Sequence, residues 1–160
     1  MPEGTATGAL RFALKKKEIL RGHGAFSEVF MHSVHFSENF INSFLNYTGS
    51  EPNLNEQSEK SPHYNIMAGF TVSKKKIRKA NGRIRVKRLL REAYRKNKQS
   101  LSDNINRNSD IKLVFTLSRK GLDIFNSGEK LTSKDVERDM ISLLININNY
   151  IDRISERKAN

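Results

Sequence analysis

Residues 74–98, KKKIRKANGRIRVKRLLREAYRKNK, combine a strongly basic face with an apolar one and so set the arrangement of the elements around them. This basic segment holds thirteen Lys and Arg and a single acid, Glu92. The chain contains 29 Lys plus Arg and 17 Asp plus Glu, so the residues outside the segment hold 16 of each sign. The formal net charge of +12 therefore lies entirely in the basic segment. Its apolar residues follow helical spacing, which predicts a helix with one buried side; they are Val86, Leu89, Leu90, Ala93 and Tyr94.

The cations of this predicted helix fall away from its apolar side. They recur at i, i+3, i+7 and i+10 as Arg88, Arg91, Arg95 and Lys98, with Arg85 one turn before the first. Such a ridge can bind a row of phosphates, because the release of condensed counterions stabilises the complex. A solvated surface is the usual fate of charged runs, but solvated faces normally mix both signs. Binding to anionic lipid or to a calmodulin-like partner stays open as an alternative.

The length and composition are those of one domain with one core. The chain has 160 residues, a mass of 18.4 kDa and 36% hydrophobic residues. The predicted elements, in chain order, are a helix over 25–32, a strand over 40–47, a strand over 64–73, the basic helix, a strand over 111–117 and a long final helix. This α-β-β-α-β-α order predicts an α+β fold in the form of a small two-layer α/β sandwich.

The remaining segments connect these elements. Residues 1–14 are predicted to form a flexible N-terminal arm, and residues 15–160 a single domain. Residues 48–62 are polar with two prolines, which predicts a loop insertion. Asn81–Gly82 is a turn or cap signal before the basic helix. The final helix begins after Thr132 or Ser133 and carries a long apolar stripe; its members are Val136, Met140, Leu143, Leu144, Ile147, Ile151 and Ile154.

Several classes of protein are excluded by what the sequence lacks. The chain has no cysteine, which excludes disulfide scaffolds, cysteine-bound zinc and a thiol nucleophile. No apolar run approaches the roughly 18–20 residues that span a bilayer, and the N-terminus has no apolar secretory signal. We therefore expect a cytoplasmic protein without a membrane partner.

Residues that could support catalysis are scattered. The four histidines, His23, His32, His35 and His63, show no metal-ligand spacing and are expected at the surface. The acids Asp110, Asp123, Asp135 and Asp139 form no recognisable carboxylate cluster, although a two-metal nuclease could be imagined from them. There is no glycine-rich phosphate loop and no GxSxG motif. The sequence therefore predicts neither catalytic residues nor a metal site in this chain.

Five phenylalanines on one predicted helix and two predicted strands form a second feature, namely Phe26, Phe30, Phe40, Phe44 and Phe70. Each ring can simply belong to the core. Alternatively, some of them rim a groove and stack on the unpaired bases of single-stranded RNA. The residues alone leave both possibilities open.

Residues 70–96, FTVSKKKIRKANGRIRVKRLLREAYRK, resemble the protein component of bacterial ribonuclease P. The resemblance has three parts in series: a strand ending Val72-Ser73-Lys74-Lys75, a short basic link, and the helix that begins RIRVKRLLREA. A weaker similarity covers residues 20–47 and 110–154. The chain departs from the family pattern at Ile84, where the family has Asn, and its loop over 48–62 is longer than usual.

The resemblance implies that the basic helix crosses between parallel strands with the rare left-handed sense. It implies a subunit that helps a catalytic RNA bind precursor tRNA, while Mg²⁺ held mainly by that RNA supports hydrolysis of the phosphodiester, and no obligate protein partner is expected. By position, the residues facing the catalytic RNA would be Arg83, Arg85, Lys87, Arg88 and Arg91. Those lining the cleft for the single-stranded 5′ leader would be Phe26, Phe30, Phe44, Lys74 and Lys75. A ribosomal or general RNA-binding protein, and a protein-only nuclease, are the alternatives.

Overall fold

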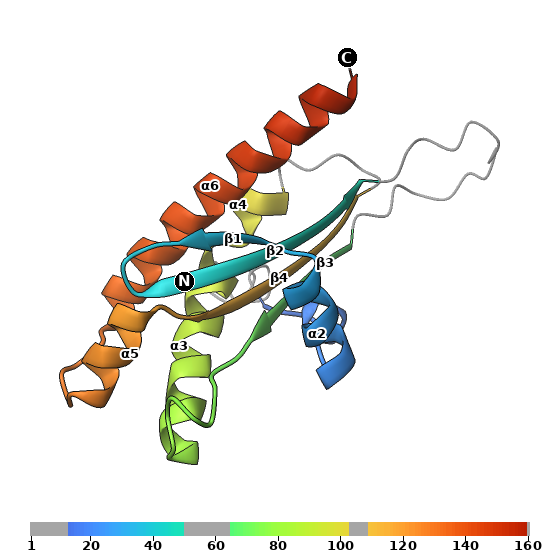
Figure 1. Ribbon diagram of the computed structural model, residues 1–160. Coiled ribbons are helices and arrows are strands. Elements are labelled where there is room, and N and C mark those ends of the chain that lie inside the picture. The colour runs from blue at the N-terminus through green and yellow to red at the C-terminus, as the bar shows by residue number, and fades with distance from the viewer. Residues whose placement is uncertain (1–12, 50–64, 103–108, 160) are drawn as a thin grey trace, which may run out of the picture.

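The computed structural model describes residues 13–49, 65–102 and 109–159 (Figure 1). Within them the chain forms a four-stranded sheet with helices on both faces. The elements in chain order are the 3-10 helix η1 (Lys16–Glu18), α2 (His23–Met31), β1 (Val34–Ser37), β2 (Ile41–Gly49), β3 (Asn65–Phe70), α3 (Ala80–Asn97), α4 (Gln99–Ser102), β4 (Ser109–Leu117), α5 (Arg119–Asn126) and α6 (Ser133–Ala159). The predicted α+β class is confirmed.

The strand order in the sheet is β1-β2-β4-β3. β2 pairs antiparallel with both β1 and β4, whereas β3 and β4 are parallel neighbours. A crossover is needed to join parallel neighbours, and α3 lies in that crossover. The basic helix is therefore held between two paired strands, as expected, and the handedness of the crossover stays a prediction.

Alternation along β4 separates the two faces of the sheet. Ile111, Leu113 and Phe115 belong to the main core under α3 and α6, whereas Val114 faces the other way and packs with Leu20 and Val29 next to α2. The apolar stripe predicted for α6 is buried from Val136 to Ile151. Burial of this stripe and of one side of α3 anchors both helices to the sheet.

The predicted order of elements missed the strand β1, the helices α4 and α5, and the 3-10 helix η1. β1 lies at the sheet edge and is mostly exposed, and its four residues are too few for the alternation of Val34 and Phe36 with polar residues to mark a strand. The helix α5 begins after Ser118, whose hydroxyl accepts a hydrogen bond from the backbone N–H of Gly121 at 3.1 Å. A side chain at Gly121 would clash with the carbonyl oxygen of Phe40, which lies between β1 and β2. The close approach of α5 to this connection therefore requires glycine.

Gly82 does not lie in a turn before the basic helix, contrary to the sequence prediction. α3 begins at Ala80, so Asn81–Gly82 lies in its first turn. A Cβ at Gly82 would lie 2.9 Å from Cγ2 of Ile77 and 3.2 Å from Cε1 of Phe125. Glycine is used here for close packing and not to end or begin a helix.

Two boundaries from the sequence fall at the edges of the described residues. Thr48 and Gly49, expected in the loop insertion over 48–62, continue β2, and the rest of that loop lies outside the described residues. Most of the arm predicted over 1–14 also lies outside them, but Leu14 packs against the core. In the described parts of the chain, none of the helices has the combination of length and apolar character needed to cross a membrane.

Candidate nucleic-acid interface

The helix α3 carries the candidate interface because one side of it is fixed in the core. Val86, Leu90, Ala93 and Tyr94 are buried against the sheet and α6. Burial raises the pKa of the Tyr94 hydroxyl, which therefore stays neutral. The cations on the other sides of α3 are held at fixed positions by this packing.

The structure divides these cations between two flanks of α3, whereas the sequence analysis placed them on one ridge. One flank consists of Lys87, Arg91 and Arg95 and borders a cleft of about 640 Å³. The other consists of Arg85, Arg88 and Lys96 and borders a groove of about 250 Å³ toward Ser133 and Glu137 of α6. The two flanks can therefore contact different phosphate chains.

The larger cleft combines a cationic wall with an apolar floor. Its floor includes Leu20, Phe26 and Phe70, and Arg21 lines its N-terminal side. The guanidinium carbon of Arg91 lies 5.8 Å from the centre of the Phe70 ring, which is a cation–π distance. Aromatic rings beside cations are the groups that hold unpaired bases and their phosphates.

Glycine lets one aromatic ring of the cleft approach the sheet. A Cβ at Gly69 in β3 would lie 2.7 Å from Cζ of Phe26. The ring of Phe26 therefore rests directly on the strand backbone, and it packs with Leu20 and Val29. This contact places α2 and the segment before it along the side of the cleft opposite α3.

Two cations of the basic segment are paired with carboxylates. Arg95 and Glu92 form an ion pair of 2.9 Å, and the hydrogen bond between them lowers the pKa of the Glu92 carboxyl and raises the pKa of Arg95. Lys98 binds Glu18 at 2.9 Å and the carbonyl oxygen of Ala13 at the same distance. Lys98 thus ties the N-terminal segment to the end of α3 and does not extend the predicted ridge.

Arg83 is also engaged inside the molecule. Its Nη1 donates hydrogen bonds to the carbonyl oxygens of Ile77 at 2.8 Å and Arg78 at 2.7 Å. The expected contact of Arg83 with the catalytic RNA stays a prediction, and the Nη1 atom of its guanidinium binds the backbone of the preceding loop. Ile84, beside it, is 56% exposed.

The phenylalanines divide between the core and the surface. Phe70 is buried and stacks on Phe115 with ring centres 5.9 Å apart. Phe30 is 45% exposed and meets Phe44 edge-on at 4.9 Å, and His35 lies 5.0 Å from the same Phe44 ring. The structure therefore brings Phe30 and Phe44 together, as expected, but on the α2 side of β1 and β2, and neither lines the larger cleft.

Lys74 and Lys75 are exposed and do not line the larger cleft either. Arg21 and Arg95, which do line it, were not assigned there from sequence. Arg21 is far from the basic segment in the chain, and only the fold brings it to the same cleft as Arg95. No rule of sequence spacing could have predicted that both residues line this cleft.

Within residues 13–49, 65–102 and 109–159, no three His, Asp or Glu come together in a way that could hold a metal ion. Asp139 is buried and accepts a hydrogen bond from the backbone N–H of Phe40 at 2.7 Å, and Asp135 contacts Thr132 at the start of α6. These two acids have structural partners. The arrangement as a whole offers cations to anionic groups and aromatic rings to flat ones.

Comparisons with known proteins agree with this chemistry. A family model described as Ribonuclease P matches residues 14–147. The ribonuclease P protein component of Chlorobaculum tepidum is 38% identical over 90 residues, which are 56% of this chain and 54% of that protein. The corresponding protein of Pseudoalteromonas atlantica is 37% identical over 78 residues, 49% of this chain and 58% of that protein. The matches thus span little more than half the length of these relatives.

The fold is also similar to a solved structure. The ribonuclease P protein from Thermotoga maritima superposes with a TM-score of 0.55 at 22% identity. The superposition covers 79% of this chain and 94% of that one. At this identity the likeness concerns the fold alone.

Proposed function

Because the chain belongs to the ribonuclease P protein family, we propose that it is the protein subunit of a ribonuclease P and promotes maturation of the tRNA 5′ end. In this role it binds a catalytic RNA and the single-stranded 5′ leader of precursor tRNA, and the RNA hydrolyses the phosphodiester. Its place of action would be the cytoplasm, where precursor tRNA is made. No obligate protein partner is part of the proposal.

One observation supports the proposal above the others. The cleft of about 640 Å³ places Lys87, Arg91 and Arg95 opposite Arg21 over a floor that includes Phe26. A single strand offers phosphates and unpaired bases together, so it fits a cleft with both cations and an aromatic ring. A duplex hides its bases and would use only the cations.

The other flank of α3 is available to a folded RNA. Arg85 and Arg88 are exposed and form no ion pair with any acid that the structure describes. We assign this flank to the phosphates of the catalytic RNA. Phe30 and Phe44 extend the leader path over the α2 side of β2.

Magnesium belongs to the RNA in this proposal. The described residues form no cluster that fits a metal ion, so the protein contributes by holding the substrate in place and neutralising its phosphates. Mg²⁺ held mainly by the RNA would supply the activated water and would stabilise the leaving oxygen.

Reconstitution with the organism's own RNA subunit at low Mg²⁺ tests the proposal. We expect the holoenzyme to bind precursor tRNA more tightly than the same tRNA without its leader. Equal binding would instead support a ribosomal or general RNA-binding protein. Cleavage by the protein without any RNA would support a protein-only nuclease and defeat the proposal.

A further inference from the structure

The segment between β3 and α3 is held in one conformation although it is strongly basic. Residues 74–79, the basic loop, begin with a turn in which the backbone N–H groups of Lys76 and Ile77 donate to the carbonyl oxygen of Ser73 at 3.1 and 3.0 Å. The Ser73 hydroxyl accepts from the N–H of Lys75 at 3.2 Å. Ile77 is 3% exposed and anchors the loop in the core.

Arg83 braces the same loop from the first turn of α3. Its Nη1 bridges two successive carbonyl oxygens, those of Ile77 and Arg78, at 2.8 and 2.7 Å. Hydrogen bonds from a charged donor are stronger than those between neutral groups. The bridge therefore fixes the path of the loop backbone while the loop side chains stay in solvent.

The helix α5 supports the loop from a third direction. The side-chain amide of Asn126 donates to the carbonyl oxygen of Lys76 at 3.1 Å. The close packing at Gly82 brings Phe125 of α5 against the start of α3 beside Ile77. Three consecutive carbonyl oxygens of the loop, from Lys76 to Arg78, thus accept hydrogen bonds from side chains of other elements.

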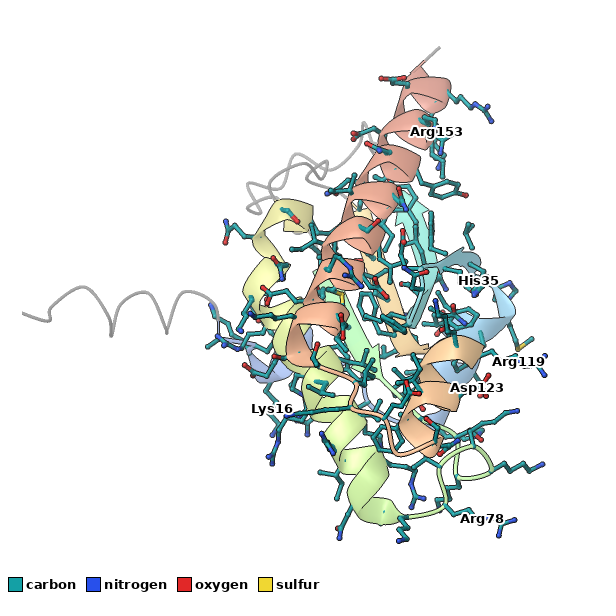
Figure 2. All side chains as sticks on the ribbon, turned by 90° about the vertical axis from the view of Figure 1, so that its left-hand side faces the viewer. Lys16, His35, Arg78, Arg119, Asp123 and Arg153 are labelled. Carbon is teal, nitrogen blue, oxygen red and sulfur yellow. The ribbon has the colours of Figure 1, made fainter. Side chains whose placement is uncertain are left out.

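The result is a group of cations on a backbone held in one conformation, with no internal partner acid. All five are exposed, and none forms an ion pair with an acid in the described parts of the chain; they are Lys74, Lys75, Lys76, Arg78 and Lys79. Figure 2 shows Arg78 at the opposite end of the molecule from Arg153, with Arg119 of α5 on the same half as Arg78. The larger cleft is lined by none of these loop cations.

We propose that the basic loop is a second, preorganised phosphate-binding surface for the backbone of the catalytic RNA, and that Arg83 is its positioning residue. This inference rests on the proposed function and adds a contact that is separate from the leader cleft. A loop already held in its bound conformation loses less entropy when it binds. The bracing contacts thus increase affinity without touching RNA.

RNA fits this surface better than an anionic membrane does. A basic segment that binds lipid stably normally also inserts apolar side chains. The apolar residue of the loop, Ile77, is buried and unavailable for insertion. Phosphates on a folded RNA instead suit cations that extend into solvent from a braced backbone.

A charge-matched pair of variants tests the surface. The loop variant is Lys75→Gln with Lys76→Gln and Arg78→Gln, which keeps Ser73 and Ile77. The control is Arg153→Gln with Arg157→Gln and Lys158→Gln, which removes the same charge from exposed positions at the far end of α6. The measurement is the dissociation constant for the RNA subunit over a range of KCl concentrations at fixed Mg²⁺.

In a plot of log affinity against log salt, the slope should be shallower for the loop variant by about 2 to 3. Each phosphate that is no longer neutralised accounts for roughly 0.7–0.9 of that slope. The control should keep the wild-type slope. Equal slopes for the loop variant and the control would overturn the proposal. It would also be overturned if the loop variant kept the wild-type RNA slope but failed to bind phosphatidylserine vesicles that the wild type binds.

The role of Arg83 is tested by Arg83→Lys, which keeps the charge but replaces the planar guanidinium. We expect faster trypsin cleavage within the basic loop and RNA affinity weaker by about 2- to 10-fold, the cost of ordering one or two side-chain groups, with an unchanged salt slope. Asn126→Ala removes the contact to Lys76 from the surface of α5 and should act in the same direction. Faster cleavage with wild-type RNA affinity in both variants would contradict a positioning role.

Failure of this inference can be told from failure of the proposed function. If the wild-type protein does not bind the RNA subunit or does not distinguish leader-containing precursor tRNA, the proposed function is wrong. If it does both and the loop variant behaves like the control, only the second surface is wrong.

Discussion

Two cations of the larger cleft allow a quantitative test of leader binding. Lys87 and Arg91 line the cleft, and Arg91 lies 5.8 Å from the centre of the Phe70 ring. The variant Lys87→Gln with Arg91→Gln removes two cations that bind phosphates of a single strand, each worth about 0.7 in the salt slope. The slope should therefore fall by about 1.4. Raising the salt from about 50 to 200 mM weakens binding of both proteins. The factor by which affinity falls should be about seven times smaller for the variant than for the wild type.

The fold should survive this change. Arg91 is exposed, and an exposed cation–π contact is worth only about 0.5–1 kcal/mol. The assay reconstitutes the holoenzyme and titrates labelled precursor tRNA, with and without its leader, at several KCl concentrations. The matched control is Arg85→Gln with Arg88→Gln, which removes the same charge from the other flank of α3.

The two variants should fail in different steps. We expect the cleft variant to lose leader discrimination while it still assembles with the RNA subunit. The control variant should assemble more weakly but keep the preference for the leader. If the cleft variant lost equal affinity for the two substrates, the cleft would not hold the leader and the reasoning from its aromatic floor would be refuted.

Three further changes test helix packing, leader binding and the pH dependence of stability. Gly82→Ala should cost about 1–3 kcal/mol through overpacking against Ile77 and Phe125, offset by about 1 kcal/mol of helix propensity; urea unfolding measures it, and an increase in stability would contradict the close contact. Phe30→Ala should cost under about 2 kcal/mol of stability because the ring is 45% exposed, yet weaken leader binding by about 1–3 kcal/mol; unchanged leader affinity would refute stacking. Asp139→Asn tests pH dependence. Burial raises the pKa of the Asp139 carboxyl, so the folded state binds its proton more readily, and wild-type stability should rise relative to the variant as the pH falls through the range just above the ordinary carboxyl pKa. A constant difference in unfolding free energy over that range would contradict this.

Periodicity predicted the elements that bury a long apolar stripe. The side of α3 from Val86 to Tyr94 and the stripe of α6 are buried as their spacing required. By contrast, β1 and α5 are short, and they form because tertiary contacts hold them. The hydrogen bond from the N–H of Phe40 to Asp139 joins residues 99 positions apart, and no local pattern could predict it.

Charge counting located the interface but not its division. The surplus charge was correctly confined to the basic segment, and helical spacing alone puts Lys87 and Arg85 about 200° apart on the helix. The sequence did not show what packs beside each flank of α3: the N-terminal segment on one side and the start of α6 on the other. The backbone partners of Arg83 likewise become visible only in the folded loop.

Lysine footprinting shows directly whether the basic segment docks on the catalytic RNA. Lysines are acetylated with and without that RNA, and the products are read by mass spectrometry. If the surplus charge of the basic segment is the docking surface, the RNA should protect Lys75, Lys76, Lys79 and Lys96 from acetylation. Lys158, exposed near the far end of α6, should react equally in both samples. Protection of Lys158 without protection of the basic segment would show that the basic segment is not the docking surface.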